Sequence, residues 1–263
     1  MDQRWVWSED ELDGWRSQVL ADDAGITLAR KEFERCGYVA VSRLIPARLR
    51  SVVASEALRL VEHVGVRRDL VLAATGYTPR LMRNVTRADI ACNGSVIEAI
   101  YDSATTTQLL SVVAGEPVFR CPYEPEQFVI TRLEEAGDTH GWHWDDYSFA
   151  LVWVAECPPN EDGGFVECIP DTVWDKAKPA VAQLVRDRVV HKLSVGAGDV
   201  YLMRTNTTLH RVYPIRRGRR TIVNMAFASA GELNAAVSHE TMDSLWSRPG
   251  AEWTGADRCN ASN

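Results

Sequence analysis

Apolar residues recur at intervals of three and four through the first part of the chain, a spacing typical of helices that bury one face. Ser8, with a glutamate three residues later, predicts a helix N-terminus, and Gly37 predicts the end of that helical stretch. Pro46 suits the first turn of a second helix that continues to about His63, and helical spacing returns over residues 95–114. The first 115 residues are therefore expected to be mostly helical, with short strands at 38–41, 70–74 and 80–85.

After residue 115 the pattern changes to short segments rich in Val, Ile and Phe, separated by turn residues. These segments cover residues 118–120, 127–132, 148–155, 164–169, 189–193, 199–203 and 220–228. Many short strands joined by turns are typical of a double-sheet jelly roll. A last helix is expected over residues 231–246.

These elements predict an α+β fold: a double-stranded β-helix core (jelly roll, cupin-like) with N-terminal helices packed on it. The sequence contains no internal repeat and no linker-like stretch, so a single domain over residues 1–263 is expected. Its helical part would span about 1–115, the jelly roll about 116–230 and the C-terminal helix about 231–250.

Composition is ordinary for a globular protein, with 46% hydrophobic and 25% charged residues. A formal net charge of −7 argues against a nucleic-acid partner, which would need clustered Lys and Arg; the one basic run, residues 216–220, is too short to change this. We expect no membrane association, because the sequence has neither a signal-peptide core nor an apolar run of membrane-spanning length. Six scattered cysteines without a Cys-x-x-Cys pair suggest reduced thiols and a cytoplasmic location. The oligomeric state stays open, a homodimer included.

Candidate chemistry centres on His143-Trp144-Asp145. On an extended strand, residues i and i+2 project to the same side, so this imidazole and this carboxylate can face one ion. Such a triplet also occurs by chance, and two ligands hold a catalytic metal poorly. His210, between two apolar runs after a long gap, supplies the third. Two histidines and one carboxylate form the facial triad of non-haem Fe(II) oxygenases.

Arg220 strengthens the hypothesis of an oxygenase. It follows Gly218 and opens an apolar β-rich run that ends near Phe227. Burying a guanidinium there is costly unless it meets an anion, and arginine binds carboxylates with two parallel hydrogen bonds. The expected anion is a carboxylate-bearing ligand.

The order His-x-Asp, long gap, His-x-Val-x-Pro, Gly-x-Arg resembles the Fe(II)- and 2-oxoglutarate-dependent oxygenases over the core from about Phe128 to Phe227. The resemblance implies that Fe(II) binds the two histidines and Asp145, that O2 is the oxidant, and that Arg220 binds the distal carboxylate of 2-oxoglutarate. In the halogenating branch of this family a small residue replaces the carboxylate and chloride takes its place. Because Asp145 is present, hydroxylation is expected here, with release of succinate and CO2.

Flanking residues carry a closer resemblance. Residues 122–128, 140–149 and Trp246 look like the small oxygenases that hydroxylate or chlorinate free amino acids, notably lysine. That resemblance implies that Glu126, His140, Asp146, Arg80 and Trp246 line an amino-acid pocket. Two carboxylates near the iron would suit an ammonium group of the substrate, and an arginine would suit its α-carboxylate. Asn224 shares a strand face with Arg220 and is a weaker candidate.

Each assignment has a structural alternative. The two carboxylates could pair with arginines of the protein, Arg80 could lie on the surface with Arg83 in its role, and Trp246 could be core packing. His140, three positions before His143, should face the other way on an extended segment and so act around the metal rather than on it. At the level of function, the alternatives are an oxygenase of a larger or carrier-tethered substrate and a non-catalytic jelly-roll module that binds a metal or small ligand.

Overall fold

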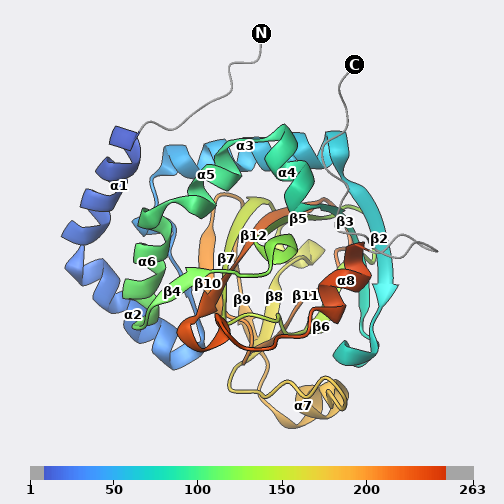
Figure 1. Ribbon diagram of the computed structural model, residues 1–263. Coiled ribbons are helices and arrows are strands. Elements are labelled where there is room, and N and C mark those ends of the chain that lie inside the picture. Colours follow the sequence, from blue (N-terminus) through green and yellow to red (C-terminus); the bar gives the residue numbers. More distant parts are fainter. Residues whose placement is uncertain (1–8, 247–263) are drawn as a thin grey trace.

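One antiparallel sheet contains all the strands of the predicted jelly roll. In this computed structural model, which describes residues 9–246, twelve strands follow the order β1-β10-β7-β12-β5-β3-β6-β11-β8-β9, with β2 paired to β3 and β4 to β12 (Figure 1). Their bounds are β1 Tyr38–Ala40, β2 Val66–Val71, β3 Pro79–Val85, β4 Val118–Arg120, β5 Phe128–Leu133, β6 Thr139–His143, β7 Phe149–Glu156, β8 Val166–Ile169, β9 His191–Leu193, β10 Val200–Arg204, β11 Leu209–Val212 and β12 Arg220–Ser229. The curled sheet confirms the predicted jelly-roll class.

Strand β3 joins the two sides of the curl. Its C-terminal part, from Arg83 to Val85, pairs with β5, whereas Arg80 and Leu81 pair with β6. One strand therefore belongs to the β5 side at one end and to the β6 side at the other. This places the first residues of β3 beside the strand that leads into the His-x-Asp motif.

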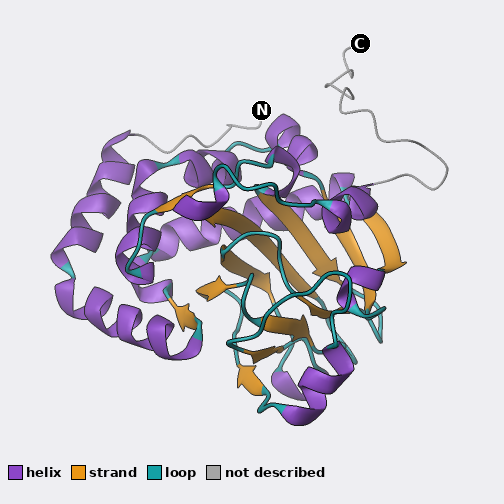
Figure 2. Ribbon diagram, turned by 60° about the horizontal axis from the view of Figure 1, so that its bottom comes forward, coloured by secondary structure: helices purple, strands orange, loops and turns teal. Residues whose placement is uncertain are grey.

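Helices cover one side of this sheet. Their bounds are α1 Glu9–Ala21, α2 Asp23–Cys36, α3 Ala47–Val64, α4 Arg87–Asn93, α5 Val96–Asp102, α6 Ala104–Ala114, α7 Val181–Asp187 and α8 Glu240–Trp246. Figures 1 and 2 show α1 to α6 gathered along the strands, with α7 and α8 apart from them. Helix α3 buries Leu49, Val53, Ala57 and Leu60 against the sheet, which is the face that its apolar spacing predicts.

The pleat of the strands separates core from cavity. On β12, Val223 and Met225 belong to the apolar core under the helices, whereas Arg220, Ile222 and Asn224 line a cavity on the other face. The same alternation on β7 sends one set of side chains to the helices and the next to the cavity. The sheet is thus buried on both faces, and its inner face forms the candidate site.

Several sequence-based boundaries were wrong in an instructive way. The helical stretch to residue 36 is two helices, divided at Asp22, whose carboxylate accepts a hydrogen bond from the Gly25 backbone N–H. The stretch 95–114 is likewise divided at Ser103, which caps α6. Side-chain capping ends one helix and begins the next without disturbing the apolar spacing. The predicted cap Ser8 lies outside the described residues.

The C-terminal helix is shorter than expected. Of residues 231–246, only α8 is α-helical; it follows a short 3-10 turn, Ala230–Glu232, and an irregular segment. Helices α4 and α7 and strands β6 and β11 were not predicted as separate elements. The two strands are short and carry the metal motif, whose polar residues break the Val/Ile/Phe pattern on which strand prediction depends.

Two expectations about the whole chain can be compared with the structure. Cys36, Cys121, Cys157 and Cys168 are free thiols as expected, whereas Cys92 is disulfide-bonded. None of the helices within residues 9–246 combines the length and apolar character needed to cross a bilayer.

A buried carboxylate links two of the helices. Glu56 on α3 accepts hydrogen bonds from the backbone N–H groups of Ser95 (3.0 Å), Val96 (3.0 Å) and Ile97 (2.9 Å), the first turn of α5. These N–H groups have no partner within a helix of their own, so a carboxylate from α3 serves as the cap.

We therefore expect Glu56→Gln to lower the free energy of unfolding by about 1–3 kcal/mol, because an amide N–H then faces backbone donors and the charge is lost. Equilibrium urea unfolding measures this. The matched control is Glu32→Gln on the exposed face of α2, which should change stability little. Equal stability of the two variants would contradict a capping role for Glu56.

Candidate active site

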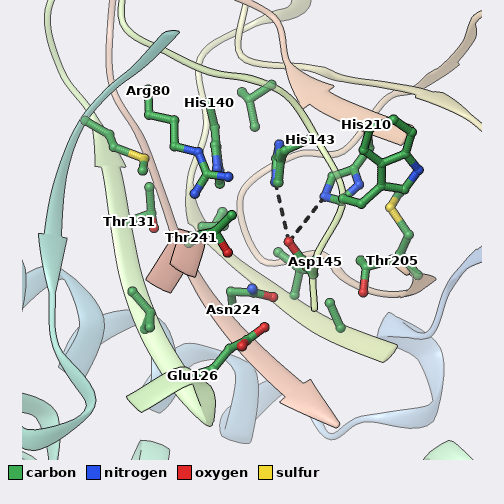
Figure 3. Close-up of a pocket in the computed structure, with 18 of the residues that line it drawn as sticks. Arg80, Glu126, Thr131, His140, His143, Asp145, Thr205, His210, Asn224 and Thr241 are labelled. Carbon is green, nitrogen blue, oxygen red and sulfur yellow. Dashed lines mark ion pairs between the residues drawn. The ribbon is translucent and has the colours of Figure 1, made fainter. Parts of the chain in front are cut away.

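The three predicted metal ligands converge. His143 ends β6, Asp145 follows two residues later, and His210 lies on β11 directly opposite His143 in the antiparallel register. Asp145 Oδ1 lies 3.5 Å from His143 Nε2 and 4.0 Å from His210 Nε2 (Figure 3). One potential ligand atom from each residue lies within 4.8 Å of the other two, so the three can hold a single ion.

Both imidazoles are oriented by the same local hydrogen bond. His143 Nδ1–H donates to the Gly141 carbonyl (2.6 Å), and His210 Nδ1–H donates to the Thr208 carbonyl (2.9 Å). Each bond commits Nδ1 to the backbone and leaves Nε2 with its lone pair toward the other ligands. Burial, reinforced by the neighbouring His140, holds the pKa of His143 well below its usual range. His143 is therefore neutral, the form that binds a metal.

His140 lies on the same side of β6 as His143, and the expectation that it faces away was wrong. In the pairing of β6 with β11, His210 is opposite His143 and Val212 is opposite His140, so three residue steps on β6 match two on β11. This irregularity is a β-bulge, which inserts one residue and restores both histidines to one face. Their rings stack with centroids 3.6 Å apart and 14° between planes.

Arg80, rather than Arg83, faces the cavity. It is buried, and in the register of β3 it lies opposite His140 on β6. Arg83 points elsewhere and pairs with Glu134 (Nε to Oε1, 2.7 Å). Burial lowers the pKa of Arg80, while the negative charge of Asp145 opposes that shift. Figure 3 shows its guanidinium beside His140, directed toward the labelled acidic residues.

Arg220 is 1% exposed at the start of β12. The Tyr201 hydroxyl and the Cys157 thiol lie near its guanidinium, whose positive charge opposes the rise that burial causes in the pKa of each. No carboxylate within the described chain forms an ion pair with it, and its Nε and Nη2 have no hydrogen-bond partner there. Two orphaned donors on a buried, planar cation fit the terminal carboxylate of a dicarboxylate such as 2-oxoglutarate. The residues present therefore fit the cosubstrate as well as the metal.

Other buried polar atoms of the cavity also lack hydrogen-bond partners. Within residues 9–246, five more buried atoms of cavity-lining residues lack a hydrogen-bond partner: Arg80 Nε, Asn84 Oδ1, Glu126 Oε2, His140 Nε2 and Asn224 Oδ1. Buried polar groups are nearly always hydrogen-bonded in folded proteins. Their concentration in one cavity indicates a polar ligand that supplies both donors and acceptors.

The acidic end of the cavity is formed by Glu126 and Asp146. Burial, with the nearby charge of Asp146, raises the pKa of Glu126 well above its usual range. Asp146 is instead compensated: Lys176 Nζ lies 2.5 Å from its Oδ1, and Thr241 Oγ1 donates to its Oδ2 (3.0 Å). The alternative that both carboxylates pair with arginines is thus wrong. In the part of the chain that the structure describes, Glu126 has no ion-pair partner, and the partner of Asp146 is a lysine.

Trp246 does not line the cavity. Its indole packs at the edge of a cluster that includes Met82, Leu133 and Leu245, so the core-packing alternative describes it. Helix α8 contributes Thr241, Met242 and Leu245 to the cavity wall instead. Trp246 lies one turn beyond Met242, at the last residue of α8, so the resemblance identified the right helix but a position past those that line the cavity.

Sequence reasoning missed some polar residues of the site. Tyr201 lies on a predicted strand and could have been found from alternation, since it shares a face with Met203 and both line the cavity. Thr241 and Lys176 gave no such signal. They reach Asp146 from segments without β periodicity that follow or interrupt the barrel.

A family model described as Halogenase D matches residues 21–247 of the chain. Among curated proteins, none matches this chain closely enough to count as a relative.

Solved structures with a similar fold include the epimerase SnoN in complex with Fe3+, alpha ketoglutarate and nogalamycin RO (19% identity, TM-score 0.58, covering 89% of this chain and 93% of SnoN). A 2OG-Fe(II) oxygenase family oxidoreductase from Burkholderia pseudomallei (18%, 0.51, 79% and 91%) and a Pseudomonas putida prolyl-4-hydroxylase (14%, 0.51, 78% and 100%) are also similar. At such identities these likenesses concern the fold, and they confirm the one expected from the sequence.

The carbonyl that orients His143 belongs to Gly141, which packs closely against the start of β3. A Cβ built on Gly141 would lie 2.6 Å from the Pro79 carbonyl oxygen and 2.9 Å from the Thr78 Cβ. An alanine there must push β6 away from the start of β3 and move the carbonyl that His143 uses.

We expect Gly141→Ala to weaken metal binding roughly tenfold or more, as the loss of a hydrogen bond that orients a ligand typically does. Anaerobic titration with Co(II), followed by its absorption spectrum, measures the affinity. Gly231→Ala is the control, because a Cβ at that glycine meets nothing within 4 Å. Unchanged Co(II) affinity in Gly141→Ala would show that His143 does not depend on this contact.

Proposed function

The chain belongs to the Halogenase D family, and from this premise and the geometry of the site we propose that it hydroxylates a free basic amino acid, L-lysine first among them. The family match and the fold confirm the coarser expectation from the sequence, a 2-oxoglutarate- and Fe(II)-dependent oxygenase. Substrate identity, the roles of single residues and hydroxylation as the outcome are the proposed part.

The observation that carries the proposal is the pair of unpartnered donors on Arg220, within the cavity that also contains the His143, Asp145 and His210 triad; residues 9–246 supply no anion for that guanidinium. In the proposal, the three ligands hold Fe(II), and Arg220 binds the far carboxylate of 2-oxoglutarate. With both bound, Fe(II), 2-oxoglutarate and O2 supply the chemistry that converts a C–H bond of the substrate to C–OH, with succinate and CO2 as co-products. Tyr201 and Cys157 lie beside the guanidinium.

Hydroxylation, rather than halogenation, is proposed because Asp145 is present. A carboxylate at this position completes a three-ligand protein set, which leaves no vacated ligand position for a halide. Membership in a family described by a halogenase does not decide this point, since the reaction outcome depends on the ligand set of each member.

For the substrate, opposite charges at the two ends of the cavity are the guide. Arg80 and Glu126 point into the same space from opposite ends, with Asn224 between them and the metal triad alongside (Figure 3). We assign Arg80 and His140 to the α-carboxylate, and Glu126 and Asp146 to the side-chain ammonium. Their orphaned atoms Nε, Nε2 and Oε2 suit those groups.

This clamp would select the carbon that reacts. Fixing both charged ends leaves the aliphatic middle of the substrate near the metal, with Val152 and Ile222 among the apolar wall residues. Holding reactants in a productive geometry is the main contribution of a protein in such chemistry. No observation favours a larger or carrier-tethered substrate, because the polar end groups of the described cavity are themselves buried.

Removing the cosubstrate anchor tests the first part of the proposal. We expect Arg220→Ala to raise the 2-oxoglutarate concentration needed for half-maximal succinate formation by roughly tenfold to a hundredfold, from the loss of charge-assisted hydrogen bonds. Iron loading, measured separately by Co(II) titration, should stay near that of the unaltered chain. Arg219→Ala is the matched control, since that side chain is half-exposed and pairs with Glu156 and Glu62. Lost iron with unchanged cosubstrate dependence would refute the assignment.

A product screen tests the substrate. The full chain, loaded with Fe(II) and 2-oxoglutarate without oxygen, is given O2 with each standard amino acid or ornithine in chloride-containing buffer. Mass spectrometry should find a basic amino acid that gains one oxygen atom, with matching succinate. Oxygen gained only by an apolar amino acid would overturn the substrate assignment. A mainly chlorinated product would overturn hydroxylation.

A further inference from the structure

One protein ammonium occupies the acidic end of the cavity. Lys176 lies in the loop between β8 and α7, and its Nζ is 2.5 Å from Asp146 Oδ1. The Asp146 side chain is 1% exposed and the Lys176 side chain 27% exposed. Since the other oxygen of Asp146 accepts the Thr241 hydroxyl, both oxygens of this carboxylate are already in use.

Lys176 has other partners within reach. Its Nζ also donates to the Ser238 carbonyl (2.6 Å) and lies 3.3 Å from Glu240 Oε2, and it sits over the Trp174 ring at 4.4 Å. The side chain of Glu240 is 44% exposed. The ammonium could therefore leave Asp146 and keep two partners and partial hydration, which makes the contact with Asp146 exchangeable.

Lys176 lies in the wall of a second hollow that borders Asp145 of the metal triad. This hollow, lined by Trp174, Lys176 and residues 236–238, shares Asp145 and Asp146 with the main cavity. Lys176 thus lies between solvent and the acidic end. Glu126 is separate evidence that a ligand binds at the acidic end. It is buried, it lines the main cavity, and its Oε2 has no partner among the described residues.

We infer that Lys176 is a resident counter-ion that a cationic substrate must displace from Asp146, and that it thereby sets how strongly the cavity prefers cationic over neutral side chains. This inference rests on the proposed function. A substrate ammonium that bridges Glu126 and Asp146 needs the Asp146 oxygen that Lys176 holds. Two ammonium groups on one carboxylate repel each other strongly in a site of reduced dielectric constant.

A neutral side chain makes no such demand. It leaves Lys176 on Asp146 and neither gains nor loses from the exchange. Removing the lysine charge should therefore tighten the binding of cations alone. A role limited to tying the 170–180 loop to the segment before α8 predicts the opposite: weaker binding of every ligand when the lysine is removed.

The test measures the affinity of the full chain, loaded with Fe(II) and 2-oxoglutarate without oxygen, by calorimetric titration of three probes: L-lysine, L-norleucine (the same carbon chain without the side-chain ammonium) and n-butylamine. The variants are Lys176→Met, which removes the charge, and Lys176→Gln, which keeps a donor for Ser238. Lys176→Arg keeps the charge, and Lys178→Met controls for the loop because Lys178 is exposed.

We expect L-lysine and n-butylamine to bind roughly threefold to tenfold more tightly to Lys176→Met and Lys176→Gln. L-Norleucine should be unaffected, and Lys176→Arg and Lys178→Met should behave like the unaltered chain. Equal or weaker binding of both cations to the two neutral variants overturns the inference, as does a parallel loss for norleucine.

Failure of the proposed function is a separate result. It would appear as the absence of any oxygenated basic amino acid from the unaltered chain. The n-butylamine titration still decides the role of Lys176 in that case, because this probe carries only the ammonium group: tighter binding to the neutral variants supports displacement, and equal or weaker binding refutes it.

Discussion

Buried ionisable groups without a partner are the constraint on which this structure depends. Arg220 and Glu126 are carried on the inner face of the sheet or at its edge, out of reach of solvent and with atoms that nothing in the described chain satisfies. Desolvating such groups opposes folding, so the remainder of the domain has to provide the compensating stability. The apolar layer between the helices and the outer face of β7, β12 and β5 is where that stability arises. The apolar core thus offsets the cost of keeping unsatisfied polar atoms in the cavity.

Backbone geometry, more than side-chain chemistry, assembles the metal centre. His143 and His210 are direct cross-strand partners, and each ring is held by the carbonyl two residues earlier. The bulge in β6 then adds His140 to the same face. Ligand spacing in the sequence is therefore a consequence of strand pairing, and the close approach at Gly141 shows how little room the pairing leaves.

The sequence predicted the parts of the site that depend on local spacing and general chemistry. The convergence of His143, Asp145 and His210 and the burial of Arg220 in the same cavity could be predicted, because i, i+2 projection and the cost of a buried guanidinium hold in any β-rich fold. The orientation of His140 could not be predicted, since a bulge changes the side of every residue on one flank of it. The contact of Lys176 with Asp146 could not be predicted for another reason. It depends on how a turn-rich loop packs against distant residues, which no periodicity in the sequence encodes. Trp246 ends α8 one turn beyond the cavity-lining Met242, and local spacing does not show which positions of a helix border a cavity.

The adjacency of Asp145 and Asp146 has a consequence for how such enzymes diversify. Just after β6, the carboxylate of Asp145 belongs to the metal triad, whereas the carboxylate of Asp146 contacts Lys176 and Thr241. On the function proposed above, one position governs what is done to the substrate and the following position governs which substrate is held. A mutation at Asp145 can then change the reaction outcome without changing substrate recognition. A mutation at Asp146 can change the substrate without changing the reaction. The residue that governs the reaction and the residue that governs substrate choice are thus direct neighbours in the chain.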